Sequence, residues 1–343
     1  MAKILCLGKK INKFLCFALD FLYLCKQILF IMRKVIGIGE TVLDIIFRND
    51  QPVSAVPGGS TFNAIISLGR SGVETGFISE TGNDRIGKMI INFLRANNCN
   101  ADSVNVYADS KSPLSLAFLN EQNDAEYIFY KDHPNDRLDF TYPQVQEDDI
   151  VFFGSYYALN PVIRPQVKDF LDYAHQHGAI LYYDVNFRSS HQHEAMKLRP
   201  NLLENFELAD IVRGSSEDFE ILFKKTDPDT VYRSEISFYT KKFIYTQASE
   251  PIELRADNGF KKQYPVKEVE TVSTIGAGDN FNAGFIFGLL KEDITRSDIE
   301  CGLTEAQWDS IIESGQQFSA EVCRSLYNYV SPEFGAKKKQ ELL

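Results

Sequence analysis

The sequence predicts an α/β protein in which a central, mostly parallel sheet carries helices on both faces. From residue 149 onward, short apolar runs typical of strands alternate with helical stretches at the spacing of strand–helix–strand units. Such crossovers are right-handed and cover both faces of a parallel sheet. Two strand-rich segments, about 41–56 and 112–135, fall outside this alternation. We expect them to form a small antiparallel β lid over the carboxyl ends of the strands, where α/β proteins bind ligands.

Each expected element follows from local patterning. Strands are assigned to short apolar or alternating runs, and helices to longer stretches with apolar residues on one side. A Pro-Gly-Gly turn at 57–59 leads into the first helix, and a polar turn at 121–124 joins two strands that we expect to pair antiparallel. The other expected helices are 86–98, 165–178, 199–208, 215–223 and 276–290, and the expected strands are 35–39, 41–47, 76–82, 114–120, 125–130, 149–154, 179–187, 210–214 and 242–247.

The composition is that of a globular protein and argues against several classes of function. The chain has 343 residues, 44% of them hydrophobic and 24% charged, which suits one large domain with an appendage. The net charge of −11 argues against a nucleic-acid partner, because neutralising phosphates requires clustered Lys and Arg. Six cysteines without a C-x-x-C motif indicate neither a disulfide framework nor a zinc site. We expect a reduced, cytoplasmic protein.

Residues 1–31 differ in character from the rest of the chain. They carry five lysines against Asp20 alone, and their apolar stretch is interrupted by Asp20 and Lys26. No uninterrupted run approaches the ~20 residues of a membrane span, and a small-x-small cleavage site typical of a signal peptide is missing. We expect an extension outside the fold and no stable membrane partner. A targeting or membrane role and an ordinary helix are the alternatives.

The rest of the chain is expected to form a single domain. This domain covers residues 32–335 and includes the lid, and residues 336–343 follow as a basic tail. A β lid has exposed strand edges, which pair readily with a second copy of the same strands. We therefore expect any homodimer to form through the lid.

The sharpest chemical signal is the stretch STIGAGDNFNAGFIFGLL at residues 273–290. Gly276, Ala277 and Gly278 open a helix, so their backbone amides and the positive end of the helix dipole form an anion site. Asp279 stands in the first turn. It either satisfies the dipole or removes a proton from an attacking hydroxyl while a phosphoryl group lies on the amides. These four residues alone leave both interpretations open.

A second polar group follows the apolar strand at 179–187. Asp184, Asn186 and Arg188 occupy alternating positions, so their side chains point the same way at the carboxyl end of the strand. The Arg188 guanidinium can bind an anion through two hydrogen bonds. An arginine that only covers the surface is the alternative.

The two glycine-rich stretches together resemble one protein family. GAGDNFNAGF at 276–285 resembles the carboxyl-terminal signature of the ribokinase-like, or PfkB, family of carbohydrate kinases, and VPGGSTFNAIISLGRSG at 56–72 resembles the amino-terminal signature. Their order and separation match, and the resemblance covers roughly residues 34–330. It implies a ribokinase-like fold with a β lid and transfer of the γ-phosphate of ATP to a sugar hydroxyl with Mg²⁺. YYDVNFRSS at 182–190 is similar to the DxNxR element of the fructokinase and 2-keto-3-deoxygluconate kinase branch.

The resemblance implies roles for individual residues. Asp279 matches the catalytic base, and the amides of Gly276, Ala277 and Gly278 match the anion hole, which stabilises charge on the transferred group. Asp44 matches an aspartate that holds sugar hydroxyls, although a lone Asp at a strand end is otherwise a turn residue. The implied substrate-binding residues are Asp44, Gly58, Gly59, Asn63 and Arg188, the nucleotide-binding residues are Thr246, Ser273, Gly276 and Gly278, and Glu217 would orient Mg²⁺ through water.

Three positions depart from the family pattern, all on the nucleotide side. Ser273 replaces an aspartate associated with a monovalent cation site, which argues against potassium activation. The Asn-x-x-Glu element appears as Gly-Ser-Ser-Glu at 214–217, so that Glu217 keeps the carboxylate while the asparagine is missing. The loop Thr-x-Gly-x-x-Gly appears at 246–251 without either glycine, and it therefore lacks its easiest points of close approach to a nucleotide.

Three functions follow from these residues. The first is an ATP-dependent sugar kinase that phosphorylates a primary hydroxyl, most similar to a fructokinase. The second is a 2-keto-3-deoxygluconate kinase, whose acidic substrate needs a further cation beside Arg188 or in the lid. The third is a sugar-binding protein that has lost catalysis, which the altered loop at 246–251 favours. Sugar and ATP are the expected partners in the first two cases.

Overall fold

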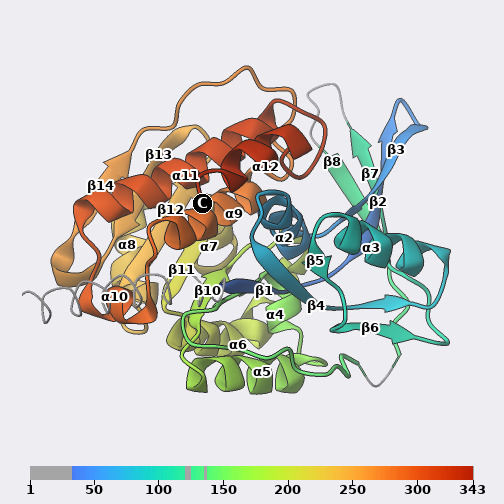
Figure 1. Ribbon diagram of the computed structural model, residues 1–343, viewed down its shortest axis with the longest axis horizontal. Coiled ribbons are helices and arrows are strands. Elements are labelled where there is room, and N and C mark those ends of the chain that lie inside the picture. The colour runs from blue at the N-terminus through green and yellow to red at the C-terminus, as the bar shows by residue number, and fades with distance from the viewer. Residues whose placement is uncertain (1–32, 120–124, 135–136, 343) are drawn as a thin grey trace, which may run out of the picture. The chain divides into compact units, whose positions relative to one another are not determined.

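The computed structural model describes residues 33–119, 125–134 and 137–342 (Figure 1). The expected extension at 1–31 and the expected turn at 121–124 therefore lie outside the described residues. Among the helices of the described ranges, none combines the length and the apolar character that a membrane span requires.

The centre of the molecule is a ten-stranded sheet. Its strands are β1 (Lys34–Ile38), β4 (Glu74–Gly82), β5 (Cys99–Asn100), β6 (Val104–Tyr107), β9 (Ile150–Gly154), β10 (Ile180–Asp184), β11 (Ile211–Ser215), β12 (Lys242–Gln247), β13 (Glu250–Arg255) and β14 (Lys261–Tyr264). They lie in the order β14-β13-β12-β11-β10-β9-β1-β4-β5, and β6 also pairs with β4. The pairs from β12 to β5 are parallel, and β13 and β14 add an antiparallel edge. The expected mostly parallel sheet is confirmed.

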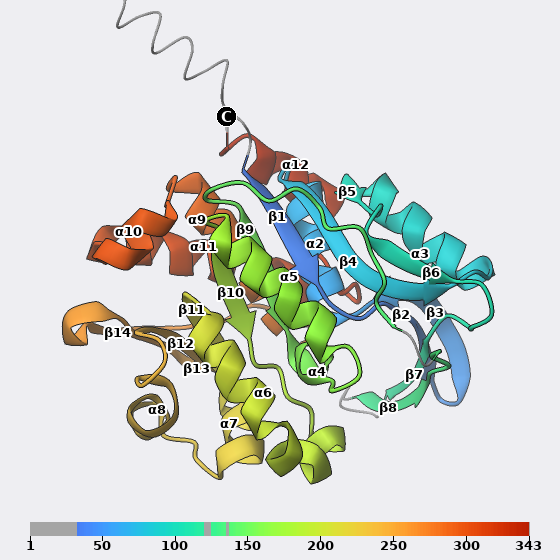
Figure 2. The same ribbon diagram turned by 90° about the horizontal axis from the view of Figure 1, so that it is seen from below.

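Helices cover both faces of this sheet. On one face lie α2 (Ser60–Arg70), α3 (Arg85–Ala96), α9 (Ala277–Lys291) and α11 (Glu305–Cys323), and on the other lie α4 (Ser155–Leu159), α5 (Arg164–Gln176), α6 (Ala195–Leu208) and α7 (Ser216–Phe223). Figure 1 shows α9 and α11 above the sheet and α5 and α6 below it, and Figure 2 shows α5 and α6 from their own side. The shorter helices are α8 (Pro228–Val231), α10 (Arg296–Cys301) and α12 (Pro332–Lys339).

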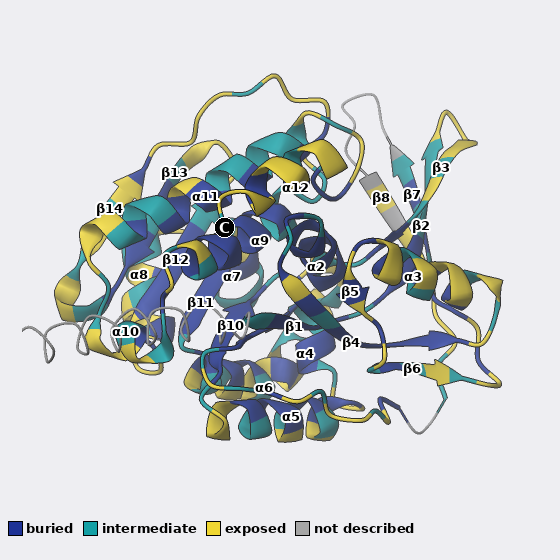
Figure 3. Ribbon diagram, viewed as in Figure 1, coloured by how far each residue is buried: buried dark blue, intermediate teal, exposed yellow. Residues whose placement is uncertain are grey.

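The central strands are buried on both faces, which explains their unbroken apolar character. All five residues of β9 and of β10 are buried (Figure 3). Phe152 and Tyr182 belong to one apolar cluster, whereas the next residues, Phe153 and Tyr183, belong to a second cluster on the other face. The strand period of two therefore builds two cores, one under each helix layer.

The lid is a separate four-stranded sheet at one end of the central sheet (Figure 1). Its strands are β2 (Val42–Arg48), β3 (Gln51–Gly58), β7 (Leu114–Leu119) and β8 (Ala125–Tyr130). Their order is β3-β2-β7-β8, with antiparallel pairs β2–β3 and β7–β8 and a parallel pair β2–β7 in the middle. The predicted antiparallel pairing of β7 with β8 is confirmed.

The carboxyl-terminal residues form ordered structure in place of the basic tail expected at 336–343. Helix α12 continues to Lys339, and Lys338 is only 6% exposed. The Lys338 Nζ donates hydrogen bonds to Gln317 and Glu341, while the same ammonium lies near the rings of Phe287 and Phe334. A lysine can bury its long stem and still keep its charge paired, so a run of lysines does not by itself mark a solvated tail.

Candidate active site

Two motifs that are far apart in the sequence meet where α9 begins. The Asn63 Nδ2 in α2 donates a hydrogen bond of 2.8 Å to Asp279 Oδ2 in the first turn of α9. The parallel register brings Asp184, the last residue of β10, opposite Arg213 of β11, and Asp184 accepts a hydrogen bond from Asn282 of α9, so the carboxyl end of β10 lies beside the beginning of this helix. The glycine-rich stretches at 56–72 and 276–285 therefore share one site, at the strand ends where the sequence predicts a ligand.

Asp279 has the surroundings of a base that works near neutral pH. Burial raises the pKa of Asp279 to about 6, although the hydrogen bond from Asn63 and the charges of Arg188 and Arg213 oppose that rise. The Asn63 Oδ1 is buried without a hydrogen-bond partner among the described residues. Asn63 therefore orients the Asp279 carboxyl with its amide and keeps an acceptor for a hydroxyl group.

The turn before α9 exposes part of the predicted anion hole. Gly276 has φ +78°, and a Cβ there would lie 2.9 Å from the Asn328 carbonyl oxygen, so a side chain is excluded for two reasons. Within the described ranges, the amides of Gly276 and Gly278 donate no hydrogen bond, whereas the Ala277 amide donates to the Thr274 carbonyl at 3.2 Å. Two of the three amides that the sequence indicates are therefore available to an anion.

Arg213 is a residue of this site that the sequence reasoning missed. Its Nη1 donates to Asp184 Oδ1 at 2.9 Å and its Nη2 to Thr246 Oγ1 at 2.6 Å. The Nη2 also lies 3.2 Å from the position that a Cβ of Gly278 would take. The signal in the sequence was a cation within the apolar strand at 210–214, because a buried arginine needs specific partners.

Asp184 is held by a second buried residue of α9. Asn282 Nδ2 donates to Asp184 Oδ2 at 2.7 Å, and Asn282 Oδ1 accepts a hydrogen bond of 2.9 Å from the Tyr182 hydroxyl. Because Asp184 and Asn282 are only 2% and 0% exposed, these contacts fix the ion pair rigidly. Asp184 therefore holds Arg213 in place, which is a role that its alternation with Arg188 did not indicate.

The lid side of the site contains the second carboxyl group. A Cβ on Gly58 would collide with Asp44 Oδ2, and one on Gly59, whose φ is +133°, would collide with the Glu40 carbonyl oxygen. Burial and, to a smaller extent, the charge of Asp279 raise the pKa of Asp44 to about 7. The charge of Arg188 lowers the pKa of both carboxyls. Asp44, Asp279 and Arg188 thus act on one another electrostatically, as the sequence predicts for a shared site.

Two further residues predicted for the site, Ser273 and Glu217, make no hydrogen bond to Asp279, Asn63 or Arg213. Ser273 is 8% exposed, and its Oγ accepts a hydrogen bond of 3.2 Å from the Ile275 amide, so its side chain closes the turn. Glu217 is exposed in the first turn of α7. The next residue, Asp218, is the buried carboxylate there, and it accepts hydrogen bonds from the Ser215 and Phe187 amides at 2.6 and 2.7 Å.

The rim of the site pairs the lid with the central domain. Lys131 Nζ, just after β8, lies 2.7 Å from Glu40 Oε1, just after β1. Arg137 forms a buried ion pair with Glu80 where the chain returns from the lid. Within the described parts of the chain, the Arg188 guanidinium makes neither a hydrogen bond nor an ion pair, although the Arg188 carbonyl accepts a hydrogen bond of 3.0 Å from the His191 amide. No three His, Cys, Asp or Glu side chains of the described residues gather as metal ligands.

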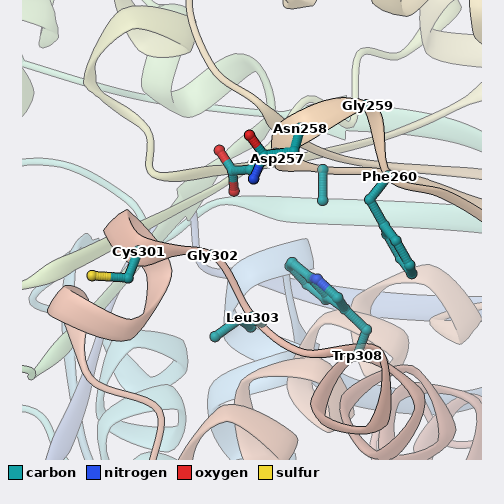
Figure 4. Close-up of a pocket in the computed structure, with 9 residues that line it drawn as sticks. Asp257, Asn258, Gly259, Phe260, Cys301, Gly302, Leu303 and Trp308 are labelled. Atoms are coloured by element: carbon teal, nitrogen blue, oxygen red, sulfur yellow. The ribbon is translucent and has the colours of Figure 1, made fainter.

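A cavity of about 340 Å³ lies away from these residues (Figure 4). Its lining consists of residues 256–260, residues 301–303 and Trp308. The register pairs Phe243, near the start of β12, with Arg255 of β13, so the turn after β13 stands at the amino end of β12. Thr246 marks the opposite, carboxyl end of β12, and the cavity is therefore separate from the candidate active site.

Comparison with known proteins yields matches over most of the chain. The family model described as "pfkB family carbohydrate kinase" matches residues 32–328. The Arabidopsis thaliana protein named "Probable fructokinase-6, chloroplastic" is 28% identical over 285 residues, covering 79% of this chain and 74% of the relative. A 5-dehydro-2-deoxygluconokinase from Bacillus thuringiensis is 26% identical over 248 residues, covering 68% of this chain and 74% of the relative.

The fold is similar to that of solved sugar kinases. The structure of a fructokinase from Vibrio cholerae O395 with fructose, ADP and calcium bound matches with a TM-score of 0.75. The match covers 88% of this chain and 96% of that chain at 18% identity, so it is evidence for the fold alone.

Proposed function

The chain belongs to the PfkB family of carbohydrate kinases, and on that premise we propose that it transfers the γ-phosphate of ATP to a primary hydroxyl of fructose. The observation that carries the proposal is the hydrogen bond of 2.8 Å between Asn63 and Asp279 beside the open amides of Gly276 and Gly278. A base and an anion hole at the start of one helix are the two parts that phosphoryl transfer requires.

In the proposed reaction, Asp279 accepts the proton of the attacking sugar hydroxyl. The new bond joins the hydroxyl oxygen to the γ-phosphorus while the bond between that phosphorus and ADP breaks, and the proton stays on Asp279 Oδ1 or Oδ2. The Gly276 and Gly278 amides donate hydrogen bonds to the phosphoryl oxygens. Arg213 lies behind Gly278, with its guanidinium paired to Asp184. Asn63 keeps the Asp279 carboxyl turned toward the sugar.

The residues present fit a magnesium ion that arrives with ATP. Such an ion keeps several waters and needs few protein ligands beside the phosphates, which agrees with the lack of a carboxylate cluster in the described residues. We infer that Glu217, exposed at the start of α7, orients the ion through water. When bound, the ion would neutralise part of the negative charge of the phosphates.

The charges at the sugar end support a neutral sugar. Asp44 and Asp279 face this end, and the nearby Glu40 already pairs with Lys131 at 2.7 Å. A sugar acid would bring a further negative charge, which Lys131 cannot neutralise while it pairs with Glu40. We therefore prefer fructose as the substrate.

One observation favours the second candidate, a kinase for 2-keto-3-deoxygluconate or a similar sugar acid. The Arg188 guanidinium has no hydrogen-bond or ion-pair partner among the described residues, and its charge influences Asp44 and Asp279 at the reacting end. An unpaired guanidinium can bind a carboxylate through two hydrogen bonds. Relatives named 5-dehydro-2-deoxygluconokinase also support this candidate.

The experiment is a coupled assay of ATP turnover with fructose, 2-keto-3-deoxygluconate, ribose and glucose as acceptors. We expect the highest kcat/KM with fructose. A preference for the sugar acid, lost in Arg188→Met, would replace fructose with the second candidate. Binding of a sugar that raises the Tm, without turnover of any acceptor, would identify the protein as a sugar-binding pseudokinase.

We further infer that the protein pairs with a second copy through the lid. The lid strands β3 and β8 are the edges of their sheet, and Val53, Ile128, Phe129 and Tyr130 are 58%, 43%, 47% and 56% exposed. Exposed apolar side chains along a strand edge are typical of an interface between copies. Light scattering should give the mass of a dimer for the wild type and that of a monomer for Ile128→Lys with Tyr130→Lys, and a monomeric wild type would contradict the inference.

A further inference from the structure

Asn280, the residue after Asp279, is fully buried and uses all of its polar side-chain atoms. Its Nδ2 donates hydrogen bonds of 2.8 Å to the carbonyl oxygens of Gly276 and Asn328. Its Oδ1 accepts a hydrogen bond of 2.5 Å from the Ser67 hydroxyl. Both Asn280 and Ser67 have 0% exposed surface. A buried asparagine satisfied in this way is held in one orientation.

This network joins three segments of the chain. Ser67 Oγ in α2 also accepts a hydrogen bond of 3.1 Å from the Val330 amide. Asn280 stands in α9, while Asn328 and Val330 belong to the segment between α11 and α12. The helix that carries Asn63, the helix that carries Asp279 and the carboxyl-terminal segment are therefore connected through two side chains.

The network meets the turn that carries the predicted anion hole at the Gly276 carbonyl, which accepts hydrogen bonds from both the backbone amide and the side chain of Asn280, at 2.9 and 2.8 Å. The Gly276 carbonyl belongs to the same planar peptide unit as the Ala277 amide, so fixing the oxygen fixes the plane. Gly276 has φ +78° and lies against the Asn328 backbone, whose carbonyl oxygen is held by the same Nδ2. The open amides of Gly276 and Gly278 stand on either side of this plane. These two amides belong to the preceding and the following peptide units, which are linked to this plane through ψ of Gly276 and φ of Ala277.

We propose that Asn280 is a positioning residue of phosphoryl transfer. It locks the left-handed turn at Gly276 to the segment 328–330, so that the amides already point at the transferred group before substrate arrives. Preorganised donors stabilise the transition state more than donors that must reorient. The inference rests on the proposed kinase function, and it adds a role for the carboxyl-terminal segment, which meets the turn at Gly276 through the backbone of Asn328.

The first test compares Asn280→Ala with a matched variant, Asn205→Ala. Asn205 is also 0% exposed, and its Oδ1 accepts a hydrogen bond of 2.6 Å from Arg164 on the opposite face of the sheet. We expect Asn280→Ala to lower kcat by about 10- to 100-fold with the KM for sugar changed by less than about 2-fold. Asn205→Ala should lower the Tm without that loss of kcat. Equal kcat values for the two variants would overturn the proposal.

The second test keeps the proposal measurable if Asn280→Ala does not fold. Ser67→Ala removes one hydrogen bond to Asn280 and one from Val330, and it should lower kcat by about 3- to 10-fold without changing the KM for sugar. In the double variant the two effects on kcat should not multiply, because both act through one network. Full additivity, or an unchanged kcat in Ser67→Ala, would contradict the proposal. A wild type without turnover would instead defeat the proposed function.

Discussion

The sugar side and the nucleotide side of the site are built by different means. On the sugar side, Gly58 and Gly59 bring the backbone close to the site, and the hydrogen bond from Asn63 to Asp279 joins two helices. On the nucleotide side, the loop after β12 has no glycine, and the left-handed residue there is Ala248, with φ +39°. An ion-paired arginine, Arg213 of β11, instead donates a hydrogen bond to Thr246 just before this loop.

The difference shows which parts of such a site can change. The proposed base and the open amides need fixed geometry, and they are supported by buried hydrogen bonds. Positive charge for a phosphate can come from a backbone amide or from a guanidinium, because both attract an anion. We infer that Arg213, bonded to Asp184 and Thr246, compensates for the missing glycines. The predictions below test the sugar side and the nucleotide side separately.

Asp279→Asn should have the largest effect, because it removes the base on the sugar side. We expect kcat to fall by about 10²- to 10⁴-fold, the usual contribution of general base catalysis. The Asn63 amide still finds an oxygen at position 279, so fructose should still raise the Tm. A variant with near-normal kcat in a steady-state assay would show that Asp279 only satisfies the helix dipole.

Arg213→Met should act on the nucleotide side alone. We expect the kcat/KM for ATP to fall by about 10- to 100-fold, while the KM for sugar changes less than about 3-fold. Arg213→Lys should recover part of the loss, because it keeps the charge beside Asp184. The control is Arg255→Met, since Arg255 is also buried, 5% exposed, and pairs with Asp229 at 2.7 Å near the amino end of β12. If Arg213→Met changed the kinetic constants for ATP and for sugar by the same factor, Arg213 would not belong to the nucleotide side alone.

Asp44→Asn should weaken sugar binding and yet stabilise the protein. The pKa of Asp44 is raised to about 7, so the folded state binds more protons than the unfolded state, and ionisation costs stability as the pH rises from about 4 to 7. We expect the variant to raise the Tm by about 2–4 °C at pH 8 and not at pH 4.

The matched control for that prediction is Asp229→Asn, for which we expect a change in Tm of the opposite sign. Hydrogen bonds from Lys261 and Arg255 hold the pKa of Asp229 down at about 2. Its ionised form therefore stabilises the fold at pH 8, and Asp229→Asn should lower the Tm there. Calorimetry at the two pH values would measure both variants, and a lower Tm for Asp44→Asn at pH 8 would contradict the account of its burial.

Replacing potassium by choline should have the smallest effect. The Ser273 hydroxyl closes its own turn, and the Val272 amide donates to the Cys323 carbonyl at 2.7 Å, so protein hydrogen bonds hold this part of the nucleotide side. We expect kcat to change by less than about 2-fold. A several-fold activation by potassium in the same assay would show that a cation still binds near Ser273.

Much of the architecture could be predicted from local patterns of apolar residues and glycines in the sequence. The apolar runs of β9 and β10 indicate burial on both faces, and the Gly-Gly and Gly-x-Gly stretches indicate close approach and an open helix end. Those patterns depend on neighbours in the sequence. The resemblance of the two glycine-rich stretches to one family, and no local pattern, placed Asn63 and Asp279 in one predicted site, which agrees with the hydrogen bond between them.

The parts that were missed depend on contacts across the fold. Arg213 acquires its role from Asp184 and Thr246 on the two neighbouring strands, which no local pattern specifies. The Ala277 amide is not free to bind an anion, because it donates a hydrogen bond of 3.2 Å to the Thr274 carbonyl. Lys338 is buried with its ammonium paired to Gln317 and Glu341, which are contacts that a run of lysines in the sequence does not indicate.

The most direct test of the central claim follows the phosphorus atom itself. Phosphorus NMR of the wild type with ATP, magnesium and fructose should show a new phosphomonoester signal that grows with ADP, and Asp279→Asn should show neither while fructose still raises its Tm. If Asp279→Asn forms the phosphomonoester at the wild-type rate, the account of Asp279 as the base at the start of α9 is contradicted.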